Sequence, residues 1–286
     1  MIRSALAQAP SHRYSPFVDV PDALGIIAGN GSYPSLLANA ARKAGVPRIV
    51  AAAFTDETSP QLADGVDEIQ WMRVGQLSKL LNFFNETAVQ HAVMAGQIAP
   101  KNLFDLRPDW KMLLLLARLK RRNAESIFTA VADELARANV ALLPATTFLG
   151  DCVARAGLIA GPKLSRREQD DVAYGFEIAK AISRLDIGQT VVVKNGTVLA
   201  VEAFEGTNET LKRGAMLGRK NAIMVKVAKP NQDMRFDVPV IGLETIRVAS
   251  EAQLRVIALE AGKTLLLERD AMVDLAERAK ISIVAR

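Results

Sequence analysis

Cysteine is nearly absent from this chain, because Cys152 is the single one among 286 residues. One thiol cannot form an internal disulfide or a cluster of thiolate metal ligands, so both are excluded and a reducing compartment fits best. No stretch reaches the roughly 20 apolar residues of a membrane-spanning helix, and residues 1–23 lack the continuous apolar core of a cleaved signal peptide. We therefore expect a cytoplasmic protein.

Aromatic residues are also scarce, at 5% of the chain. That scarcity argues against an aromatic stacking surface for single-stranded nucleic acid, so no nucleic-acid partner is expected. Half of the residues are hydrophobic, and a chain of this length can bury an aliphatic core in two domains of ordinary size. The net charge of +5 and the pI near 9.4 suit an anionic ligand or a phospholipid surface.

The first half of the chain alternates strand-like and helical runs. In chain order these runs are Leu24–Ile27, Ser35–Ala44, Arg48–Phe54 and His91–Ala95. Such alternation indicates a parallel sheet covered by helices. Residues 110–122 and 126–137 are typical of a helix pair, and a further strand is expected at residues 140–144. We predict a Rossmann-like α/β domain over residues 23–150, preceded by a loose arm at residues 1–22.

The second half mixes the two kinds of element. One helical run and two strand-like runs stand out, at Gln169–Ile182, Thr190–Lys194 and Thr197–Glu202. Asn195-Gly196 between the strands is a strong hairpin signal, because both central residues of a type I′ turn need positive φ. Residues 149–166 are irregular and contain the domain boundary. We predict a second, mixed α/β domain over residues 160–286.

Two glycine turns follow strands of the first domain. Gly29-Asn30-Gly31-Ser32 lacks the third glycine of a dinucleotide-binding fingerprint, because Pro34 stands there, and no P-loop lysine follows. Amides at a helix N-terminus still favour an anion, although a tight turn that needs glycine only for its φ is the alternative. The second turn contains Gly96 and Gln97. Because parallel strands share one carboxyl edge, we expect both turns to line one crevice.

Carboxylates, amides and ammonium groups concentrate in three stretches of the second domain. These stretches are Asp186–Gln189, Glu202–Asn208 and Lys226–Gly242. Oxygen ligands hold magnesium and ammonium groups offset phosphate charge, so this composition suits a magnesium-diphosphate site. Mg²⁺ generally uses one or two protein carboxylates, and the candidates are Asp237, Asp233, Glu202 and Glu205. Taken singly, each of these carboxylates is better explained by a surface salt bridge or a cap.

The run from Trp110 to Arg122 joins an apolar stretch to the cations Arg118, Lys120, Arg121 and Arg122. It suits a membrane surface or lipid acyl chains, with the basic end on headgroup phosphates. A core helix with a solvated end is the alternative interpretation.

Three further functional classes can be weighed. A Ser-His-Asp hydrolase finds no support, because neither Ser32 nor Ser165 has a local partner. A dehydrogenase is suggested by the first glycine turn and by Asp56 at the end of the next strand, but the third glycine and an evident hydride-handling side chain are missing. A non-catalytic binder of nucleotide sugars or lipids would share the crevice but would not need Asp237.

Five stretches carry the most distinctive residues, and they are Leu24–Pro34, Met94–Gln97, Arg184–Gln189, Val198–Thr207 and Lys229–Gly242. Together they resemble the UDP-2,3-diacylglucosamine pyrophosphatases of the LpxI type, which act in lipid A synthesis. The resemblance runs from about Leu24 to the end of the chain. Its last three stretches are the most specific.

The resemblance implies a two-domain enzyme, a homodimer in peripheral contact with the inner membrane, that binds a UDP-linked lipid between its domains. It implies hydrolysis of the diphosphate with a divalent cation such as Mg²⁺. The products would be UMP and 2,3-diacylglucosamine 1-phosphate, known as lipid X. On this view the first domain binds UDP and the second is catalytic.

The family's essential aspartate precedes a Leu-Pro-Thr-Ile-Gly motif, and Asp237 holds that position here, before Val-Pro-Val-Ile-Gly. The resemblance gives Asp237 the role of metal ligand or water-orienting group, with Lys226, Lys229 and Gln232 completing the catalytic set. The expected substrate-binding residues are Gly29, Asn30, Gly31, Ser32, Gly96, Gln97, Gln189, Glu202, Glu205, Gly206 and Thr207. Gln97 and the arm before Leu24 depart from the family pattern.

Overall fold

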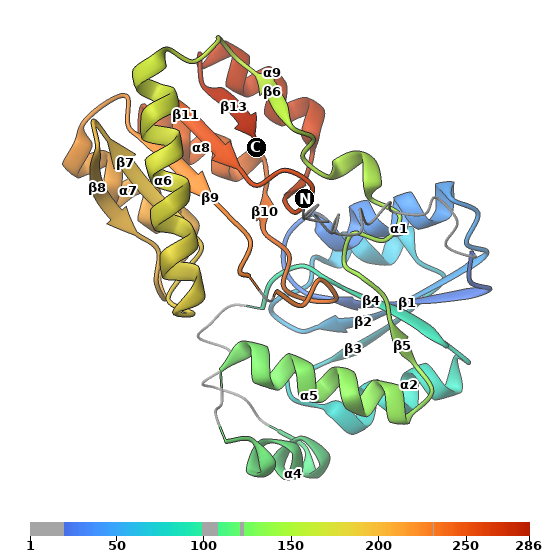
Figure 1. The fold of residues 1–286 in the computed structure, drawn as a ribbon. Coiled ribbons are helices and arrows are strands. Elements are labelled where there is room, and N and C mark those ends of the chain that lie inside the picture. Colours follow the sequence, from blue (N-terminus) through green and yellow to red (C-terminus); the bar gives the residue numbers. More distant parts are fainter. Residues whose placement is uncertain (1–19, 99–107, 121–122, 231) are drawn as a thin grey trace, which may run out of the picture.

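The computed structural model describes residues 20–98, 108–120, 123–230 and 232–286 (Figure 1). Most of the arm expected at residues 1–22 therefore lies outside the described residues. The chain forms two α/β lobes, which we call the N-terminal lobe (residues 20–153) and the C-terminal lobe (residues 154–286). Within the described ranges, no helix has the length and hydrophobicity needed to cross a membrane.

A parallel five-stranded sheet forms the centre of the N-terminal lobe, in the order β3-β2-β1-β4-β5. The strands are β1 (Ala23–Ala28), β2 (Arg48–Phe54), β3 (Glu68–Met72), β4 (His91–Ala95) and β5 (Ala141–Leu142). The helices are α1 (Tyr33–Lys43), η1 (Pro60–Gly65), α2 (Leu77–Glu86), α4 (Trp110–Arg118) and α5 (Ala124–Arg137). The predicted Rossmann-like parallel sheet is confirmed.

Burial of both faces explains why the central strands are continuous apolar runs rather than alternating ones. Leu37 of α1 packs in one buried cluster with Ile26 of β1, and Phe84 of α2 packs in another with Val50 of β2. Figure 1 shows α1 on one face of the sheet and α2 and α5 on the other. The carboxyl ends of β1 and β4 lie side by side at the edge that faces the C-terminal lobe.

The C-terminal lobe contains a mixed six-stranded sheet in the order β6-β13-β11-β9-β7-β8. Its strands are β6 (Gly157–Ala160), β7 (Thr190–Lys194), β8 (Thr197–Val201), β9 (Ile223–Lys226), β11 (Val256–Leu259) and β13 (Ser282–Ala285). The helices are α6 (Arg166–Arg184), α7 (Thr207–Gly218), α8 (Leu243–Glu251) and α9 (Arg269–Arg278). A short pair, β10 (Val240–Ile241) and β12 (Leu265–Leu266), lies apart from this sheet. The predicted second mixed α/β domain is confirmed.

The hairpin predicted at Asn195-Gly196 is present, and both residues have positive φ, 52° and 71°. The carboxylate of Asp171 on α6 accepts hydrogen bonds from both turn amides, at 2.8 and 2.7 Å. The turn is therefore fixed by local backbone chemistry and by one buried carboxylate.

Several element ends differ from the sequence prediction. Helix α1 begins at Tyr33 rather than Ser35, because Pro34 is compatible with a first helical turn. Helix α6 begins at Arg166 rather than Gln169, because Ser165 and Glu168 form a capping box.

The sequence prediction is also wrong for the ends of α4 and β5. Helix α4 ends at Arg118, before the predicted end at residue 122. Strand β5 covers only Ala141–Leu142, because Pro144 has no amide to donate and Ala145 instead donates to the Met234 carbonyl at 2.7 Å.

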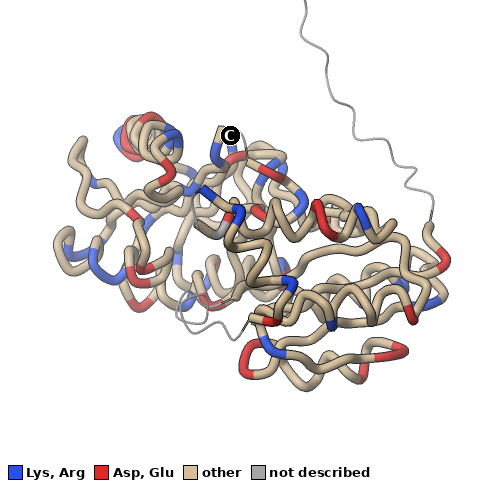
Figure 2. Tube along the Cα trace, turned by 90° about the horizontal axis from the view of Figure 1, so that it is seen from below, with Lys and Arg blue, Asp and Glu red and all other residues tan. Residues whose placement is uncertain are grey.

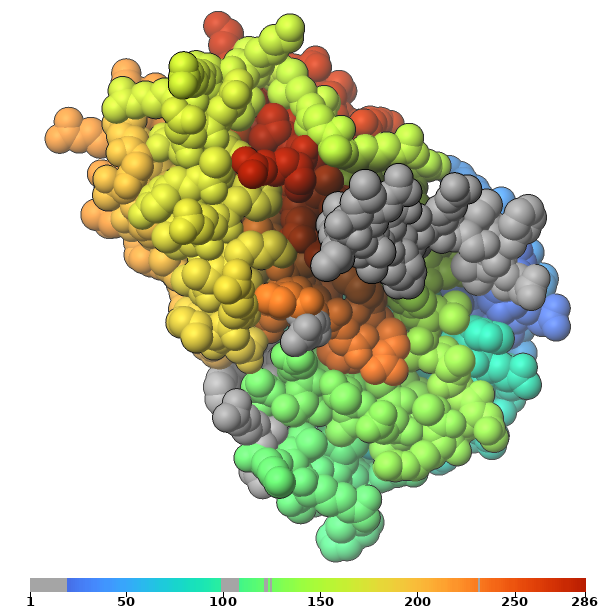
Figure 3. All heavy atoms as spheres, viewed as in Figure 1, coloured from blue at the N-terminus to red at the C-terminus, as the bar shows by residue number. Residues whose placement is uncertain are grey.

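The two lobes pack directly against each other. Leu265 and Leu267 of the C-terminal lobe belong to the same buried cluster as Leu37 and Ile26 of the N-terminal lobe. The segment between β9 and β10 reaches across, and its Phe236 ring lies 5.8 Å from the Phe128 ring of α5. Figure 3 shows this orange segment against the green surface of the N-terminal lobe.

Candidate active site

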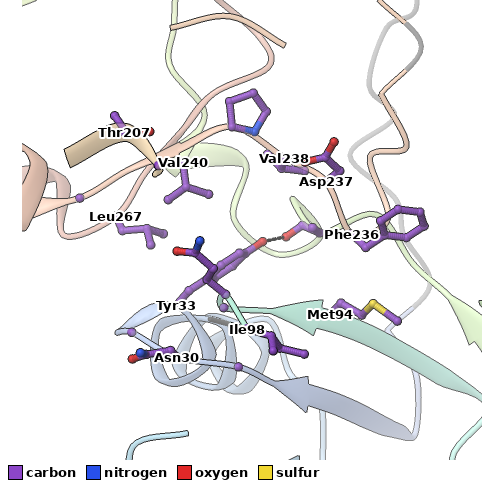
Figure 4. Close-up of a pocket in the computed structure, with 18 of the residues that line it drawn as sticks. Asn30, Tyr33, Met94, Ile98, Thr207, Phe236, Asp237, Val238, Val240 and Leu267 are labelled. Carbon is purple, nitrogen blue, oxygen red and sulfur yellow. Dashed lines mark hydrogen bonds between the residues drawn. The ribbon is translucent and has the colours of Figure 1, made fainter. Parts of the chain in front are cut away.

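A cavity of about 770 Å³ lies between the lobes. Every expected site residue lines it except Lys229 and Gln232. Figure 4 shows Asn30 and Tyr33 approaching from the N-terminal lobe and Asp237 from the segment before β10. The crevice expected at the sheet edge is thus present, and the C-terminal lobe forms its second wall.

The two glycine turns of the N-terminal lobe cross at close range. Asn30 donates to the Gln97 carbonyl at 2.7 Å, and Gln97 donates back to Asn30 at 3.3 Å. A Cβ atom at Gly29 would lie 2.7 Å from the Gln97 carbonyl oxygen, and one at Gly96 would lie 2.6 Å from the Asn30 oxygen. Backbone crossing therefore requires glycine at both positions, whether or not a ligand is bound.

Gly96→Ala should lower the free energy of unfolding by about 1–3 kcal/mol more than Gly31→Ala, the cost typical of overpacking. Both glycines have nearly the same positive φ, 92° and 90°, so both variants carry similar backbone strain. Only Gly96 has backbone atoms where the new methyl group would go, because Gly31 faces open space. Urea unfolding of both variants measures the difference, and equal losses would show that the crossing can relax.

The start of α1 already faces a carboxylate of the protein. The Ser32 hydroxyl donates to Glu268 Oε1 at 2.6 Å, across the lobe boundary. Glu268 has a positive φ of 55°, an uncommon backbone conformation for a residue other than glycine. A negative side chain is favourable at a helix N-terminus. The Glu268 carboxylate therefore offsets part of the positive charge of the α1 N-terminus at this end of the cavity.

A buried hydrogen-bonded chain forms the wall opposite the glycine turns. Lys226 at the end of β9 donates to the Thr207 hydroxyl at 2.7 Å, and Thr207 donates to Glu202 Oε1 at 2.8 Å. Lys226 is 6% exposed and Glu202 is 7% exposed. Three elements meet here because the strand ends of β8 and β9 and the start of α7 lie at one edge of the sheet. The wall therefore presents one ammonium and one carboxylate.

The charge of Glu202 is stabilised by its surroundings. Burial alone would raise its pKa, but the Lys226 ammonium and the Thr207 hydroxyl outweigh burial and hold the pKa below its ordinary value. Glu202 Oε2 and Gln189 Oε1 are buried without a hydrogen-bond partner among the described residues. Because unpaired buried acceptors are costly, these two oxygens are suited to a bound donor or cation.

Helix α7 directs its N-terminus at the same wall. Gly206, with φ 84°, lets the chain turn into the helix, and Gly206 and Thr207 line the cavity. Glu205 is held by Arg213, at 2.5 Å, and by the Thr210 hydroxyl at 3.1 Å, and the Arg213 hydrogen bond is the main cause of its lowered pKa. Glu205 thus has structural partners within α7.

Asp237 belongs to a second charged group, centred on the ammonium of Lys229. Lys229 Nζ lies 3.7 Å from Asp237 Oδ2 and 3.9 Å from Glu125 Oε2 of α5, and it also pairs with Asp186. Burial would lower the Lys229 pKa, but these carboxylates outweigh it and raise the pKa, with the hydrogen bond to Asp186 foremost. Asp237 alone of this group lines the cavity.

The remaining polar residues of this segment are engaged locally. Gln232 Oε1 accepts from the Lys229 amide at 2.6 Å, which shapes the turn that places Lys229, while Gln232 Nε2 is buried without a described partner. Asp233 pairs with Arg235 at 2.6 Å and accepts the Asp237 amide through its carbonyl at 2.9 Å. Lys229 and Gln232 therefore support Asp237 from outside the cavity lining.

The donor set can be tested for a metal ion. Among the described residues, no three His, Cys, Asp or Glu side chains cluster as a metal site. Of the four candidate carboxylates, Glu205 and Asp233 pair with arginines, whereas Asp237 and Glu202 line the cavity without an arginine partner among the described residues. Mg²⁺ is commonly held by one or two carboxylates together with substrate phosphates. The residues present fit that mode of binding.

Sequence reasoning missed the apolar part of the cavity. Its residues are Ile27, Tyr33, Phe54, Met94, Ile98, Phe128, Phe236, Val238, Val240 and Leu267. Burial raises the Tyr33 pKa, and its hydroxyl donates to the Ala145 carbonyl, as the dashed line in Figure 4 marks. Tyr33 and Phe236 lie within recognised stretches, but nothing in the sequence connects Phe128 or Leu267 to a site.

Both lobes match models of known protein domains. Residues 23–152 match the LpxI N-terminal domain and residues 155–284 match the LpxI C-terminal domain. A curated protein of Caulobacter vibrioides, named UDP-2,3-diacylglucosamine pyrophosphatase LpxI, is 30% identical over 267 residues, covering 89% of this chain and 94% of that protein.

Two solved structures show only slight likeness. The biotin carboxylase domain of 2-oxoglutarate carboxylase from Hydrogenobacter thermophilus has a TM-score of 0.26 and 11% identity, over 68% of this chain and 41% of that one. The biotin carboxylase subunit of pyruvate carboxylase has a TM-score of 0.26 and 14% identity over the same shares. Scores this low carry no argument. The matches of both lobes, and the relative spanning nearly the whole chain, show that this chain belongs to the LpxI family.

Proposed function

We propose that this protein hydrolyses the diphosphate of UDP-2,3-diacylglucosamine, giving UMP and 2,3-diacylglucosamine 1-phosphate (lipid X). Membership of the LpxI family supports the reaction, because the curated relative is named for it. The observation that carries the proposal is the interlobe cavity, where Asp237 and Lys226 share a wall with hydrophobic side chains. A substrate with a charged diphosphate and two acyl chains needs both kinds of surface.

The ammonium of Lys226 and the N-terminus of α7 bind the diphosphate in this proposal. Lys226 is oriented by the Thr207 hydroxyl, and the amides at the start of α7 add a favourable dipole. Asp237 orients the attacking water, and the Lys229 ammonium at 3.7 Å helps to hold its carboxylate in place. The diphosphate is thereby held beside a charged acceptor for the water proton.

A divalent cation, taken as Mg²⁺, would be held by Asp237, with Glu202 as a second oxygen donor. When bound, it neutralises phosphate charge and activates water. The family resemblance, the position of Asp237 in the cavity lining and the unpaired Oε2 of Glu202 support this part of the proposal.

The proposed division of labour follows the two lobes. Residues 23–150 would bind the UDP portion through the glycine turns and Gln97, and residues 160–286 would supply the catalytic groups. A cytoplasmic homodimer working at the inner membrane is proposed on the family resemblance. Figure 2 shows acidic and basic residues interspersed over both lobes, which gives no support for an extended nucleic-acid surface.

UMP release tests the proposed reaction. We expect release from UDP-2,3-diacylglucosamine in detergent micelles with Mg²⁺, loss of that release with excess EDTA, and its recovery when Mg²⁺ is restored. UDP-N-acetylglucosamine, which lacks the acyl chains, serves as the matched substrate and should not be turned over. Binding of the lipid without UMP under any metal condition would favour a non-catalytic binder instead.

A further inference from the structure

We propose that the outer face of α4 docks this protein onto an anionic phospholipid bilayer. The inference rests on the proposed function for its partner, because a diacyl substrate resides in a bilayer. The surface itself is defined by the structure. We call Trp110, Leu113, Leu114 and Ala117 the α4 stripe.

The spacing of the α4 stripe is i, i+3, i+4 and i+7, which places all four side chains on one helical face. Trp110 is 73% exposed, Leu113 is 47% exposed and Leu114 is 42% exposed. The inner face of the helix is packed against the protein, because Met112 and Leu115 are buried in the core of the N-terminal lobe. Helix α4 is therefore apolar on two faces, and no described residue covers the outer one.

The helix is held firmly enough to present this stripe. The Asp109 carboxylate caps α4 by accepting from the Met112 amide at 2.9 Å, and it also accepts from the Ser78 amide of α2 at 2.6 Å. Lys111 pairs with Glu134 of α5 at 3.3 Å. These contacts tie α4 to two neighbouring helices, so ordering α4 at a membrane costs little. Figures 1 and 3 show α4 projecting at the lower end of the molecule.

The charges beside the stripe fit an anionic lipid surface. Lys111, Arg118 and Lys120 are exposed there, and Arg118 and Lys120 have no carboxylate partner among the described residues. Arg121 and Arg122 follow in the sequence but lie outside the described ranges. Tryptophan and leucine beside lysine and arginine are typical of an interfacial helix, whose apolar face enters the headgroup region while its cations bind phosphates.

Charge also favours a bilayer over a second copy of this chain. A symmetric contact through the α4 stripe would bring Arg118 and Lys120 of both molecules into one interface. Among the described residues, the carboxylate at the start of the helix is that of Asp109, and it is committed to the two caps. Like charges without partners oppose such a dimer, whereas phosphate headgroups neutralise them.

Helix α5 connects α4 with the cavity that is proposed to hold the lipid. Helix α5 follows α4 after a short connection, and Phe128 of α5 lines the interlobe cavity. The turn after α6 contacts that connection, where Asn123 Nδ2 donates to Asp186 Oδ2 at 3.2 Å, and the adjacent Leu185 and Ile187 are exposed. Docking through α4 would thus bring the apolar side of the cavity towards the membrane that supplies the substrate.

Cosedimentation of the full chain with vesicles tests the proposal. Phosphatidylcholine vesicles containing phosphatidylglycerol should bind the protein, and pure phosphatidylcholine vesicles should bind it more weakly. Leu113→Gln with Leu114→Gln should weaken partitioning at least about tenfold, since two leucines lose their membrane contact. Arg118→Glu with Lys120→Glu should remove the preference for anionic vesicles.

The matched control is Met216→Gln with Leu217→Gln on α7, because these residues are even more exposed than Leu113 and Leu114, at 76% and 58%, but lie outside the α4 stripe. The control should bind vesicles like the native chain. UMP release from detergent-dispersed substrate should be unchanged in the stripe variants, which separates docking from catalysis. If UMP is released normally but no vesicle binds, or if the stripe variants bind like the native chain, docking fails and the proposed reaction stands. If sedimentation velocity shows that the stripe variants lose a dimer, the occupant is a second copy and the membrane assignment is overturned.

Discussion

Replacing Asp237 with asparagine is expected to lower UMP release from UDP-2,3-diacylglucosamine by about 10²–10⁴-fold, the range for losing a group that handles the attacking water. The amide keeps the size of the carboxylate but loses its negative charge, its proton-accepting capacity and most of its affinity for a cation. Little stability should be lost, because the charge contact of the Asp237 side chain among the described residues is a long one, with Lys229 at 3.7 Å.

Asp186→Asn is the matched control for Asp237→Asn. Both changes remove one carboxylate beside the Lys229 ammonium, but only Asp237 lines the cavity. The control should keep activity within a few fold, and circular dichroism melts of the two variants should agree. Equal activity losses would mean that Lys229 electrostatics, and not the Asp237 carboxylate itself, limit the reaction. An unfolded Asp237→Asn protein would remove the catalytic assignment.

Local rules account for much of the fold. The Asn195-Gly196 hairpin follows from the φ values of two residues, and β1, β2 and β4 follow from short apolar runs between turns. Helix ends were less predictable, because capping depends on side-chain hydrogen bonds such as the Ser165 and Glu168 pair. The length of β5 depended on Pro144 and on a contact with a segment nearly a hundred residues away.

The candidate site was predictable as a set of residues but not as an arrangement. The sequence suggested that Gly29 and Gly96 serve a ligand or a turn, whereas the structure shows two backbones that cross. Ser32 and Glu268 lie 236 residues apart, so no local pattern could pair them. The cavity wall contributed by Phe128 likewise depends on how α5 packs against the C-terminal lobe.

The sequence also could not show which of the four candidate carboxylates pair with arginines. Composition alone treats Glu202, Glu205, Asp233 and Asp237 as equivalent donors. Arg213 and Arg235 occupy Glu205 and Asp233 through ion pairs that span eight and two residues. These pairs form only when the loops have folded, so sequence spacing could not reveal which carboxylates would be paired with an arginine.

Replacing Lys226 with methionine is expected to abolish most activity and also to destabilise the protein by about 3 kcal/mol, the low end for removing one partner of a buried charge pair. Methionine fills the space of the lysine stem but leaves the Glu202 carboxylate buried without its neighbouring cation, although the Thr207 hydroxyl still donates to it. Since Lys226 holds the Glu202 pKa below its ordinary value of 4.5, this pairing stabilises the native fold above about pH 4.5 and is lost as pH falls through the lower folded value. The stability gap between native chain and variant should therefore narrow in acid.

Adding Glu202→Gln to the Lys226→Met variant separates the structural effect from the catalytic one. The double variant no longer buries an uncompensated charge, so urea unfolding at neutral pH should recover most of the lost stability. Its activity should stay as low as that of Lys226→Met, because the ammonium proposed to bind the diphosphate is still absent. Recovery of both properties together would show that Lys226 acts only by neutralising Glu202, and the diphosphate would then need another cation.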